Sequence, residues 1–260
     1  MFNHVSARIV FALLLAVFVF TCWKYGITRW QISAIGMLLV SYVVLLVYGS
    51  YFIQSNFFVK SLCKGDTGKK QIAITFDDGP MKDFTPKVLD ILKTEKVPAA
   101  FFLIGRNIQG NEELVKRMIA EGHVIGNHSF EHGFWFSLQS KSKMISDAEK
   151  CDTAIKEVTG LQPKLFRPPY GVTNPMVAQL IKQRNYHSIG WSVRTYDTNA
   201  KSAEGLLQKT LKNLCAGDVI LFHDWGQHTI GMLSEFISQA RKRGFEFVRV
   251  DELLNIKAYY

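Results

Sequence analysis

The chain has 260 residues, a formal net charge of +9 and 48% hydrophobic residues. This length favours one domain of ordinary size with an added segment over two full domains. The Lys and Arg residues are scattered and no nucleic-acid-binding motif accompanies them, so we predict no nucleic-acid partner. A solvated surface explains most of the charge, and attraction to anionic lipid or to an acidic polymer stays open. The four cysteines are far apart and show no CxxC spacing, which argues against a cysteine zinc site.

Two apolar segments come first in the chain. Residues 8–23 are almost continuously apolar, and residues 31–53 form a longer run without a charged residue. A helix needs roughly 20 apolar residues to cross a bilayer core, so the second run is long enough and the first is borderline. Residues 24–26 lack the small-residue pattern of a signal-peptide cleavage site. We therefore predict a transmembrane helical hairpin in a membrane anchor of residues 1–57, with a cleaved signal peptide or a buried core helix as the alternatives.

Residues 58–69 are predicted to link the anchor to the rest of the chain. Four lysines follow the second apolar run, at positions 60, 64, 69 and 70. The positive-inside rule would hold this flank in the cytoplasm. Large folded domains cross a membrane with little regard to such charge, so the rule alone does not decide the topology.

After residue 70, apolar runs typical of strands alternate with segments of helical periodicity. The predicted strands cover residues 71–76, 99–105, 123–129, 164–169, 186–193, 218–223 and 245–250. The predicted helices cover residues 86–96, 111–121, 141–158, 174–184, 202–214 and 229–243. Such alternation indicates parallel βαβ units. About 190 residues are few for eight full units, so we predict an α/β fold, a distorted (β/α)7-8 barrel, for residues 70–260, with an open doubly wound sheet as the alternative.

Polar residues follow the predicted strands, at the end where barrels of this type place reactive groups. Asp77 and Asp78 come directly after the first strand. In a cleft, two adjacent carboxylates repel each other, and a nearby cation would keep both ionised. His128 and His132 follow the third strand and can converge on one ion if the segment turns helically. With a carboxylate they would form a His, His, Asp ligand set that leaves coordination positions open for water and substrate.

Later strand ends carry further candidates. Arg167 precedes a pair of prolines, and an arginine there can hold a carboxylate bidentately. Trp191 lies in the fifth strand, which leads to Asp197. His223 ends the sixth strand and could donate a proton to a leaving group. Each of these residues alone fits a structural role, but their joint occurrence in chain order at strand ends favours a reactive site.

Four of these segments resemble the motifs of carbohydrate esterase family 4, the polysaccharide deacetylases. They are TFDDGP (75–80), HSFEH (128–132), RPPYG (167–171) and LFH (221–223), and the resemblance spans roughly residues 70–250. The family includes chitin, peptidoglycan and rhizobial chitooligosaccharide deacetylases. The resemblance implies a metal-dependent hydrolase that removes acetyl groups from N-acetylated amino sugars of a cell-envelope or extracellular polysaccharide.

The resemblance also implies a role for each matching residue. Its divalent metal, most often zinc although Co²⁺, Mn²⁺ or Ni²⁺ is also accepted, would be held by Asp78, His128 and His132. The catalytic residues would be the general base Asp77, Arg167 that orients it, the general acid His223, and Asp197 that orients His223. The substrate groove and the acetyl pocket would be lined by Pro169, Tyr170, Trp191 and Leu221, and the backbone N–H of Tyr170 would help to bind the oxyanion.

One position departs from the family pattern. In many members an aspartate lies three residues before the position matched by Asp197, and this chain has Arg194 there. The departure alters the charge arrangement beside the site and bears on the substrate class. The proposed ligands, base and acid are all present, so we do not interpret the site as inactive.

Two alternative functions remain at this stage. The same residues could serve an O-acetyl esterase acting on acetylated glycans, or the chain could be a non-catalytic, membrane-tethered glycan-binding protein. Loss of a metal ligand, the base or the acid would have indicated the second alternative, and none is lost. Because the family's usual substrates lie outside the cytoplasm, we expect an anchor in a bacterial inner membrane and a periplasmic or otherwise extracytoplasmic catalytic domain. The sequence makes no prediction of an oligomeric state.

Overall fold

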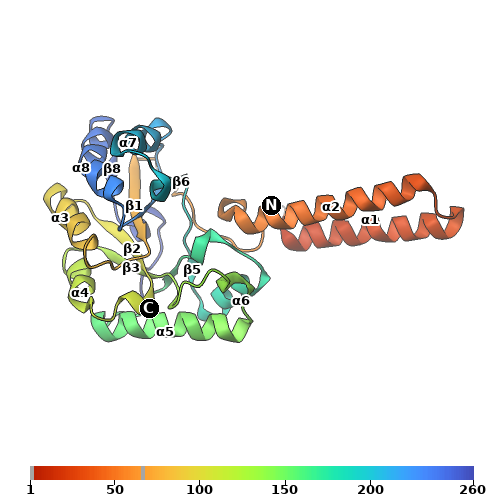
Figure 1. Ribbon diagram of the computed structural model, residues 1–260, viewed down its shortest axis with the longest axis horizontal. Helices are drawn as coiled ribbons and strands as arrows, with labels where there is room; N and C mark the ends of the chain where they lie inside the picture. The colour runs from red at the N-terminus through yellow and green to blue at the C-terminus, as the bar shows by residue number, and fades with distance from the viewer. Residues whose placement is uncertain (1–2, 66–67) are drawn as a thin grey trace.

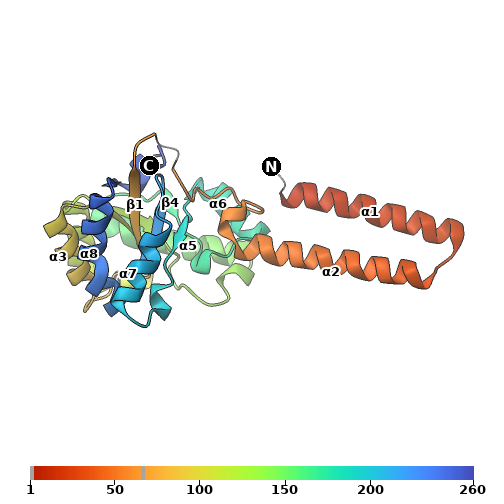
Figure 2. The ribbon, with the colours of Figure 1, turned by 90° about the horizontal axis from the view of Figure 1, so that it is seen from above.

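The structure is a computed structural model that describes residues 3–65 and 68–260. It consists of an α/β domain and a helical hairpin that projects from one side of it (Figures 1 and 2). The hairpin comprises α1 (His4–Tyr25) and α2 (Arg29–Tyr51). Its connecting turn lies at the far end, while the start of α1 and the end of α2 lie beside the domain (Figure 1). Asp66 and Thr67, in the predicted linker, lie outside the described residues.

Local capping explains why both hairpin helices begin earlier than the apolar runs. The Asn3 side chain accepts hydrogen bonds from two backbone N–H groups of the first turn of α1. Thr28 and Gln31 form a reciprocal capping box at the start of α2. Both helices are long and apolar enough to cross a membrane by length and composition. Nearly all of their side chains are outside the protein core, with Ala7 and Gly49 as the buried residues.

The domain is built on an eight-stranded sheet in which every pairing between strands is parallel. Its strands are β1 (Gln71–Asp77), β2 (Ala99–Leu103), β3 (Val124–Asn127), β4 (Leu165–Phe166), β5 (His187–Ser188), β6 (Val193–Arg194), β7 (Val219–His223) and β8 (Glu246–Phe247). Their order is β5-β4-β3-β2-β1-β7-β6, and β8 pairs with the first residues of β1. The long strands β1, β2 and β7 therefore lie together in the middle of the sheet.

The prediction of one strand over residues 186–193 is wrong, and the difference explains how the sheet curls. β5 pairs with β4 at one end of the sheet, whereas β6 pairs with β7 at the other. Residues 189–192 thus connect the two ends of the sheet. Backbone hydrogen bonds hold this segment at both ends, from Ile189 to Phe166 and from Ser192 to Val219. The predicted distorted barrel is confirmed, and the open doubly wound sheet is not observed in the described residues.

The segment before β1 fills the gap in this closure. Leu62 forms a parallel bridge with Ile189, and its carbonyl accepts a hydrogen bond from the backbone N–H of Gly190. A Cβ at Gly190 would collide with the Sγ of Cys63, so the close approach of these two segments requires glycine. Part of the predicted linker therefore completes the barrel wall.

Helices cover the outside of the sheet (Figure 1). They are α3 (Thr85–Glu95), α4 (Glu112–Ala120), α5 (Lys141–Thr159), α6 (Pro175–Arg184), α7 (Ala203–Lys212), α8 (Gln227–Lys242) and the short α9 (Val250–Leu253). Short 3-10 turns occur at η1 (Ile53–Ser55), η2 (Gly105–Asn107), η3 (Phe136–Leu138), η4 (Pro169–Gly171) and η5 (Asp197–Asn199). The predicted strand 245–250 is shorter than expected because α9 begins at Val250.

Alternation along β1 decides which side chains enter the barrel. Ile72, Ile74 and Phe76 belong to the large core that the sheet forms with its covering helices. Ala73 belongs to a separate core cluster with residues of β2, β3, β4 and β7. Because successive strand residues point to opposite faces, the side chain of Asp77 shares the inner face with that of Ala73.

Candidate active site

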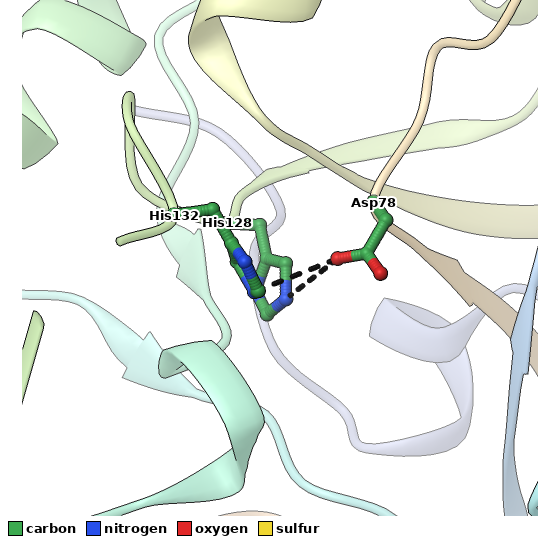
Figure 3. Close-up of side chains that lie close together, drawn as sticks. All are labelled: Asp78, His128 and His132. Atoms are coloured by element: carbon green, nitrogen blue, oxygen red, sulfur yellow. Dashed lines mark ion pairs between the residues drawn. The ribbon is translucent and has the colours of Figure 1, made fainter. Parts of the chain in front are cut away.

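The candidate active site lies at the carboxyl ends of the strands, as the sequence predicts. Asp78 follows β1, and His128 and His132 follow β3 (Figure 3). The Asp78 Oδ1 atom lies 3.6 Å from His128 Nε2 and 3.5 Å from His132 Nε2. Figure 3 shows both imidazole rings turned toward the same carboxylate oxygen. Asp78 and His132 have left-handed backbone conformations, with φ of 74° and 49°, so these loops hold the two side chains in uncommon local geometries.

This group of side chains fits a divalent cation. One ligand atom from each of the three residues lies within 4.8 Å of the others. Ligand atoms that surround a zinc ion tetrahedrally at its usual bond lengths lie about 3.4 Å apart, close to the two separations observed. Two neutral imidazoles with one carboxylate are also a common donor set for catalytic zinc. The predicted ligands are therefore brought together in a geometry that could hold a metal ion.

The protonation of both histidines suits that use. His128 Nδ1 lies 2.7 Å from the carbonyl oxygen of Arg167, so Nδ1–H donates to this carbonyl and Nε2 keeps its lone pair toward Asp78. Burial is the largest cause that lowers the pKa of His128, to about 3. Burial also lowers the pKa of His132. Both imidazoles are neutral near pH 7, the state in which histidine binds a metal.

Buried polar groups that sequence reasoning missed hold the loop of the two histidines. The Asp147 carboxylate on α5 accepts hydrogen bonds from the backbone N–H groups of Phe130 and Glu131. The Ser129 hydroxyl accepts one from the backbone N–H of His132. Ser129 lies inside the quoted motif and could have been suspected, but Asp147 lies in a helix with no local signal. Its role depends on the packing of α5 beside the loop.

Asp77 lies inside the barrel and is held by Arg167. Arg167 Nη1 donates to Asp77 Oδ1 at 2.6 Å and to the Thr75 hydroxyl at 2.9 Å. Its other donors bond to the carbonyl oxygens of Ile189 and Gly190. The pair is therefore linked through one nitrogen and one carboxylate oxygen rather than bidentately. Burial raises the pKa of Asp77, and the charge of Arg167 opposes that rise.

His223 is held in a complementary way by Asp197. His223 Nδ1 lies 2.8 Å from Asp197 Oδ1, and Asp197 Oδ2 accepts hydrogen bonds from the His223 backbone N–H and the Thr229 hydroxyl. Burial alone would lower the pKa of His223, but the hydrogen bond and charge of Asp197 outweigh it and raise that pKa. His223 Nε2 lies 3.8 Å from Asp78 Oδ2. This nitrogen thus faces the candidate metal ligands and can carry a proton there.

These groups surround a cavity of about 270 Å³. The residues that line it are Asp77, Asp78, His128, His132, Tyr170, Gly171, Trp191, Arg194, Thr198, Leu221, His223 and Trp225. Three of the four residues predicted to line the groove and acetyl pocket are among them. Pro169 is buried and is not among the lining residues. The Trp191 ring lies where a Cβ of Gly171 would stand, so the motif glycine makes room for the wall of the pocket.

Trp225 and Thr198 are further lining residues that sequence reasoning missed. The indole Nε1 of Trp225 lies 3.4 Å from Asp78 Oδ2. Trp225 could have been suspected from the sequence, because it is an aromatic residue that directly follows His223 and Asp224.

Asp224 itself is fully buried, and its carboxylate accepts a hydrogen bond from the Thr85 hydroxyl at the start of α3. Burial raises the pKa of Asp224 to about 7.

Comparison with known proteins identifies the family. The polysaccharide deacetylase family model matches residues 64–189. A peptidoglycan-N-acetylglucosamine deacetylase of Bacillus cereus is 39% identical over 198 residues, which cover 73% of this chain and 90% of the relative. The chain belongs to the polysaccharide deacetylase family. The resemblance predicted from the motifs is thereby confirmed.

Other members of the polysaccharide deacetylase family extend the comparison. The peptidoglycan-N-acetylglucosamine deacetylase PgdA of Listeria monocytogenes is 37% identical over 206 residues, which cover 79% of this chain and 43% of that relative. The chain thus spans less than half the length of the Listeria protein. The crystal structure of the Bc1960 peptidoglycan N-acetylglucosamine deacetylase superposes with a TM-score of 0.73 and 33% identity, covering 76% of this chain and 94% of that chain. The distorted barrel is thus the fold of a solved family member.

Proposed function

We propose that this protein is a metal-dependent deacetylase that hydrolyses N-acetyl groups of amino sugars in a cell-wall polysaccharide or a related glycan. One observation carries the proposal. A carboxylate held by a buried arginine and an imidazole held by a buried carboxylate line the same cavity as the three candidate metal ligands. A general base, a general acid and a cation site in one small cavity are what the hydrolysis of an unreactive amide requires.

Asp78, His128 and His132 are the residues that would hold the divalent metal, most often zinc. A divalent ion bound there supplies Lewis acidity, which polarises a carbonyl group and lowers the pKa of water. The His128 Nδ1–H bond to the Arg167 carbonyl orients that imidazole toward the site. The ligand set and this orienting hydrogen bond support the proposal of metal dependence.

On the base side, Asp77 removes a proton from the attacking water. Its Oδ1 atom is tied to Arg167, which leaves Oδ2 toward His128 at 3.7 Å from Nε2. Burial raises the pKa of Asp77 and so favours proton uptake, while the charge of Arg167 opposes that rise. Asp77 can therefore take up a proton within the cavity, and the charge of Arg167 favours its return to the ionised form.

On the acid side, His223 donates a proton from Nε2 to the departing amine nitrogen. An amide needs this step more than an ester does, because an unprotonated amine is a very poor leaving group. Asp197 stabilises the imidazolium and fixes the ring through Nδ1. We assign the wall formed by Tyr170, Trp191 and Leu221 to the acetyl methyl group and the sugar ring.

The substrate class is proposed from the relatives. The Bacillus cereus and Listeria monocytogenes relatives are both named as peptidoglycan-N-acetylglucosamine deacetylases. We accordingly propose an N-acetylglucosamine-containing glycan as the substrate of this chain. An O-acetyl esterase would use the same residues, and the experiment below separates the two activities.

We further propose residues 1–57 as a membrane anchor, residues 58–69 as the linker and residues 70–260 as the catalytic domain. The length and apolar surface of α1 and α2 support the anchor. The start of α1 and the end of α2 both lie beside the catalytic domain (Figure 1), so the chain's N-terminus and this domain would share one side of the membrane. We propose the extracytoplasmic side, where cell-wall glycans occur. A C-terminal reporter that works only outside the cytoplasm tests this, and absence of signal would overturn it.

The full-length chain in detergent provides the test of activity. Acetate release would be measured from N-acetylglucosamine oligomers and peptidoglycan fragments, before chelation, after chelation and after zinc is restored. We expect release that chelation abolishes and zinc restores. Release from O-acetylated glycans alone would favour the esterase. No release from any acetylated glycan, by a protein that binds zinc, would favour a non-catalytic binding protein.

A further inference from the structure

A second cavity adjoins the candidate active site at the end of the hairpin. It has a volume of about 280 Å³ and is lined by Tyr51, Phe52, Ile53, Gln54, Trp191, Ser192, Arg194 and Tyr196. Trp191 and Arg194 also line the cavity of the candidate active site. The two cavities are therefore neighbours that share these two side chains, and a ligand that occupies one can reach toward the other.

The chain that leaves α2 lines the second cavity and packs against Trp191, which lines both cavities. Ile53 is 2% exposed and forms one core cluster with Trp191 and Leu221. Gln54 Nε2 donates a hydrogen bond of 2.7 Å to the carbonyl oxygen of Trp191. The end of the hairpin is thus held against the pocket proposed for the acetyl group. The second cavity lies where the hairpin meets the domain.

The Arg194 side chain lines this cavity and has no anionic partner among the residues that the structure describes. Among residues 3–65 and 68–260, its guanidinium makes no hydrogen bond or ion pair, and it lies over the rings of Trp191 and Tyr196, at 5.5 and 4.9 Å from their centroids. Within the same described ranges, no carboxylate lines the second cavity. A partly buried cation without a counter-ion is unfavourable, and a guanidinium matches the oxygens of a phosphate with its parallel N–H donors.

Further positive charge surrounds Tyr196. Lys209 Nζ lies 4.3 Å from the centroid of its ring. Tyr196 and Lys209, together with Lys201, line another cavity of about 330 Å³, and no carboxylate is among its lining residues in the described part of the chain. The face beside the candidate active site thus presents cations and hydrogen-bond donors, a surface suited to an anionic group.

We propose that Arg194 binds a phosphate group of the substrate, so that the substrate is a glycan joined through phosphate to a membrane lipid rather than a finished wall polymer alone. The inference rests on the proposed function, because the acetamido sugar must occupy the neighbouring cavity. A saccharide carried by a lipid phosphate places its phosphate between the sugar and the membrane. The second cavity lies between the cavity of the candidate active site and the proposed membrane anchor. A phosphate that joins the sugar to a membrane lipid would occupy this place.

Two matched substrates test the inference with the full-length chain in a phosphate-free maltoside detergent. They are an N-acetylglucosamine trisaccharide with a 1-phosphate at its reducing end and the methyl glycoside of the same trisaccharide. We expect the chain to prefer the phosphate ester by about tenfold or more in kcat/KM, as one charge-assisted contact implies. Arg194→Gln should bring this ratio near one. Arg194→Asp, which restores the aspartate of the family pattern, should bring it below one.

A matched control separates this contact from the overall charge of the protein. Lys182 is exposed on α6, and Lys182→Gln removes one positive charge there. We expect this variant to keep the preference of the unchanged chain. An equal loss of preference in both variants would overturn the inference, because general attraction would then explain it.

Other results distinguish a failure of the phosphate proposal from a failure of the proposed function. Acetate release from the methyl glycoside without any preference for the phosphate ester would overturn the inference and leave the proposed function intact. Calorimetric titration of both trisaccharides tests the contact even without turnover, and equal affinities would also overturn it. Activity on the methyl glycoside that rises with anionic phospholipid, depends on Arg194 and shows no phosphate preference in detergent would assign the cavity to a lipid headgroup instead.

Discussion

In each half of the candidate active site, a buried partner of opposite charge holds a titratable side chain, but one side chain is the proposed base and the other is the proposed acid. In the base half, the Asp77 carboxylate is paired with a cation inside the barrel, and both side chains are at most 5% exposed. In the acid half, the His223 imidazole is paired with the Asp197 carboxylate, and its side chain is 20% exposed. A charged partner stabilises the ionised form in each case. The Asp77–Arg167 pair is shielded from solvent and should contribute more to folding stability, whereas His223 is accessible enough to titrate with solvent.

The largest effect on activity is expected in the base half. Asp77→Asn keeps a side chain that can accept the hydrogen bond of Arg167 but removes the base. We expect acetate release to fall by a factor of about 10²–10⁴, the usual contribution of a general base. The rate is measured well below the thermal unfolding midpoint, because the neutral amide leaves the buried Arg167 without its counter-charge and lowers that midpoint. Asp90→Asn, at an exposed carboxylate on α3, is the control and should leave the rate unchanged. Near-normal activity of Asp77→Asn would refute the base assignment.

Stability should distinguish the buried pair from a surface pair. Arg167→Met leaves a buried carboxylate and the carbonyl oxygens of Ile189 and Gly190 without their donor. We expect the free energy of unfolding to fall by about 3–5 kcal/mol, measured by denaturant titration of the full chain in detergent.

The control for this change is Arg117→Met, which breaks the two ion pairs of a partly exposed arginine, with Asp90 and with Glu121. Exposed pairs contribute about 0–1 kcal/mol, so its effect should be several times smaller. Equal effects of the two variants would contradict the contrast between a buried and an exposed pair.

Removal of the metal ion should destabilise the loop that carries His128 and His132, which lies between the two halves of the candidate active site. A cation that binds only the folded chain stabilises it by about 2.7 kcal/mol at a hundred times its dissociation constant. We expect zinc to raise the thermal unfolding midpoint of the unchanged chain and to have a much smaller effect on His132→Ala. A zinc effect of the same size in Lys182→Gln and in His132→Ala would place the ion elsewhere.

The smallest expected effect concerns the acid half and is a shift in the pH dependence of kcat. The proposed acid must be protonated, so activity is lost as the pH rises through the pKa of His223, which Asp197 raises. Asp197→Asn removes that charge, and the alkaline limb of kcat should move to lower pH. Thr229→Val removes one neutral hydrogen bond to Asp197 and should move the limb less. An unmoved limb in Asp197→Asn would exclude His223 as the titrating acid.

The same pair contributes to stability with a definite sign. The folded-state pKa of His223 is raised, so its contribution is fully present below the unfolded pKa and is lost as the pH rises through the folded pKa. In Asp197→Asn this loss should be absent from the pH dependence of the unfolding free energy. The measurement is denaturant titration at a series of pH values between those two limits.

The sequence alone determined the parts of the site that depend on local patterns. Asp77 and Asp78 directly follow the predicted strand 71–76, which places them at the edge where the carboxyl ends of parallel strands meet. The candidate ligands Asp78, His128 and His132 therefore converge as their positions after β1 and β3 predict. Helix positions also followed from periodicity, because each helix covers the sheet with one apolar face.

Only the tertiary structure decided the contacts between segments far apart in the chain. Residues 186–193 are predicted as one strand, yet they contribute to two strands because closure of the barrel requires them to leave β4 and reach β7. The same closure supplies the carbonyl groups that hold Arg167 and brings the end of α2 against Trp191. Hydrophobic periodicity reports only which face of a segment is buried. The segment against which that face packs depends on how the whole sheet curls, and a local sequence pattern does not determine this.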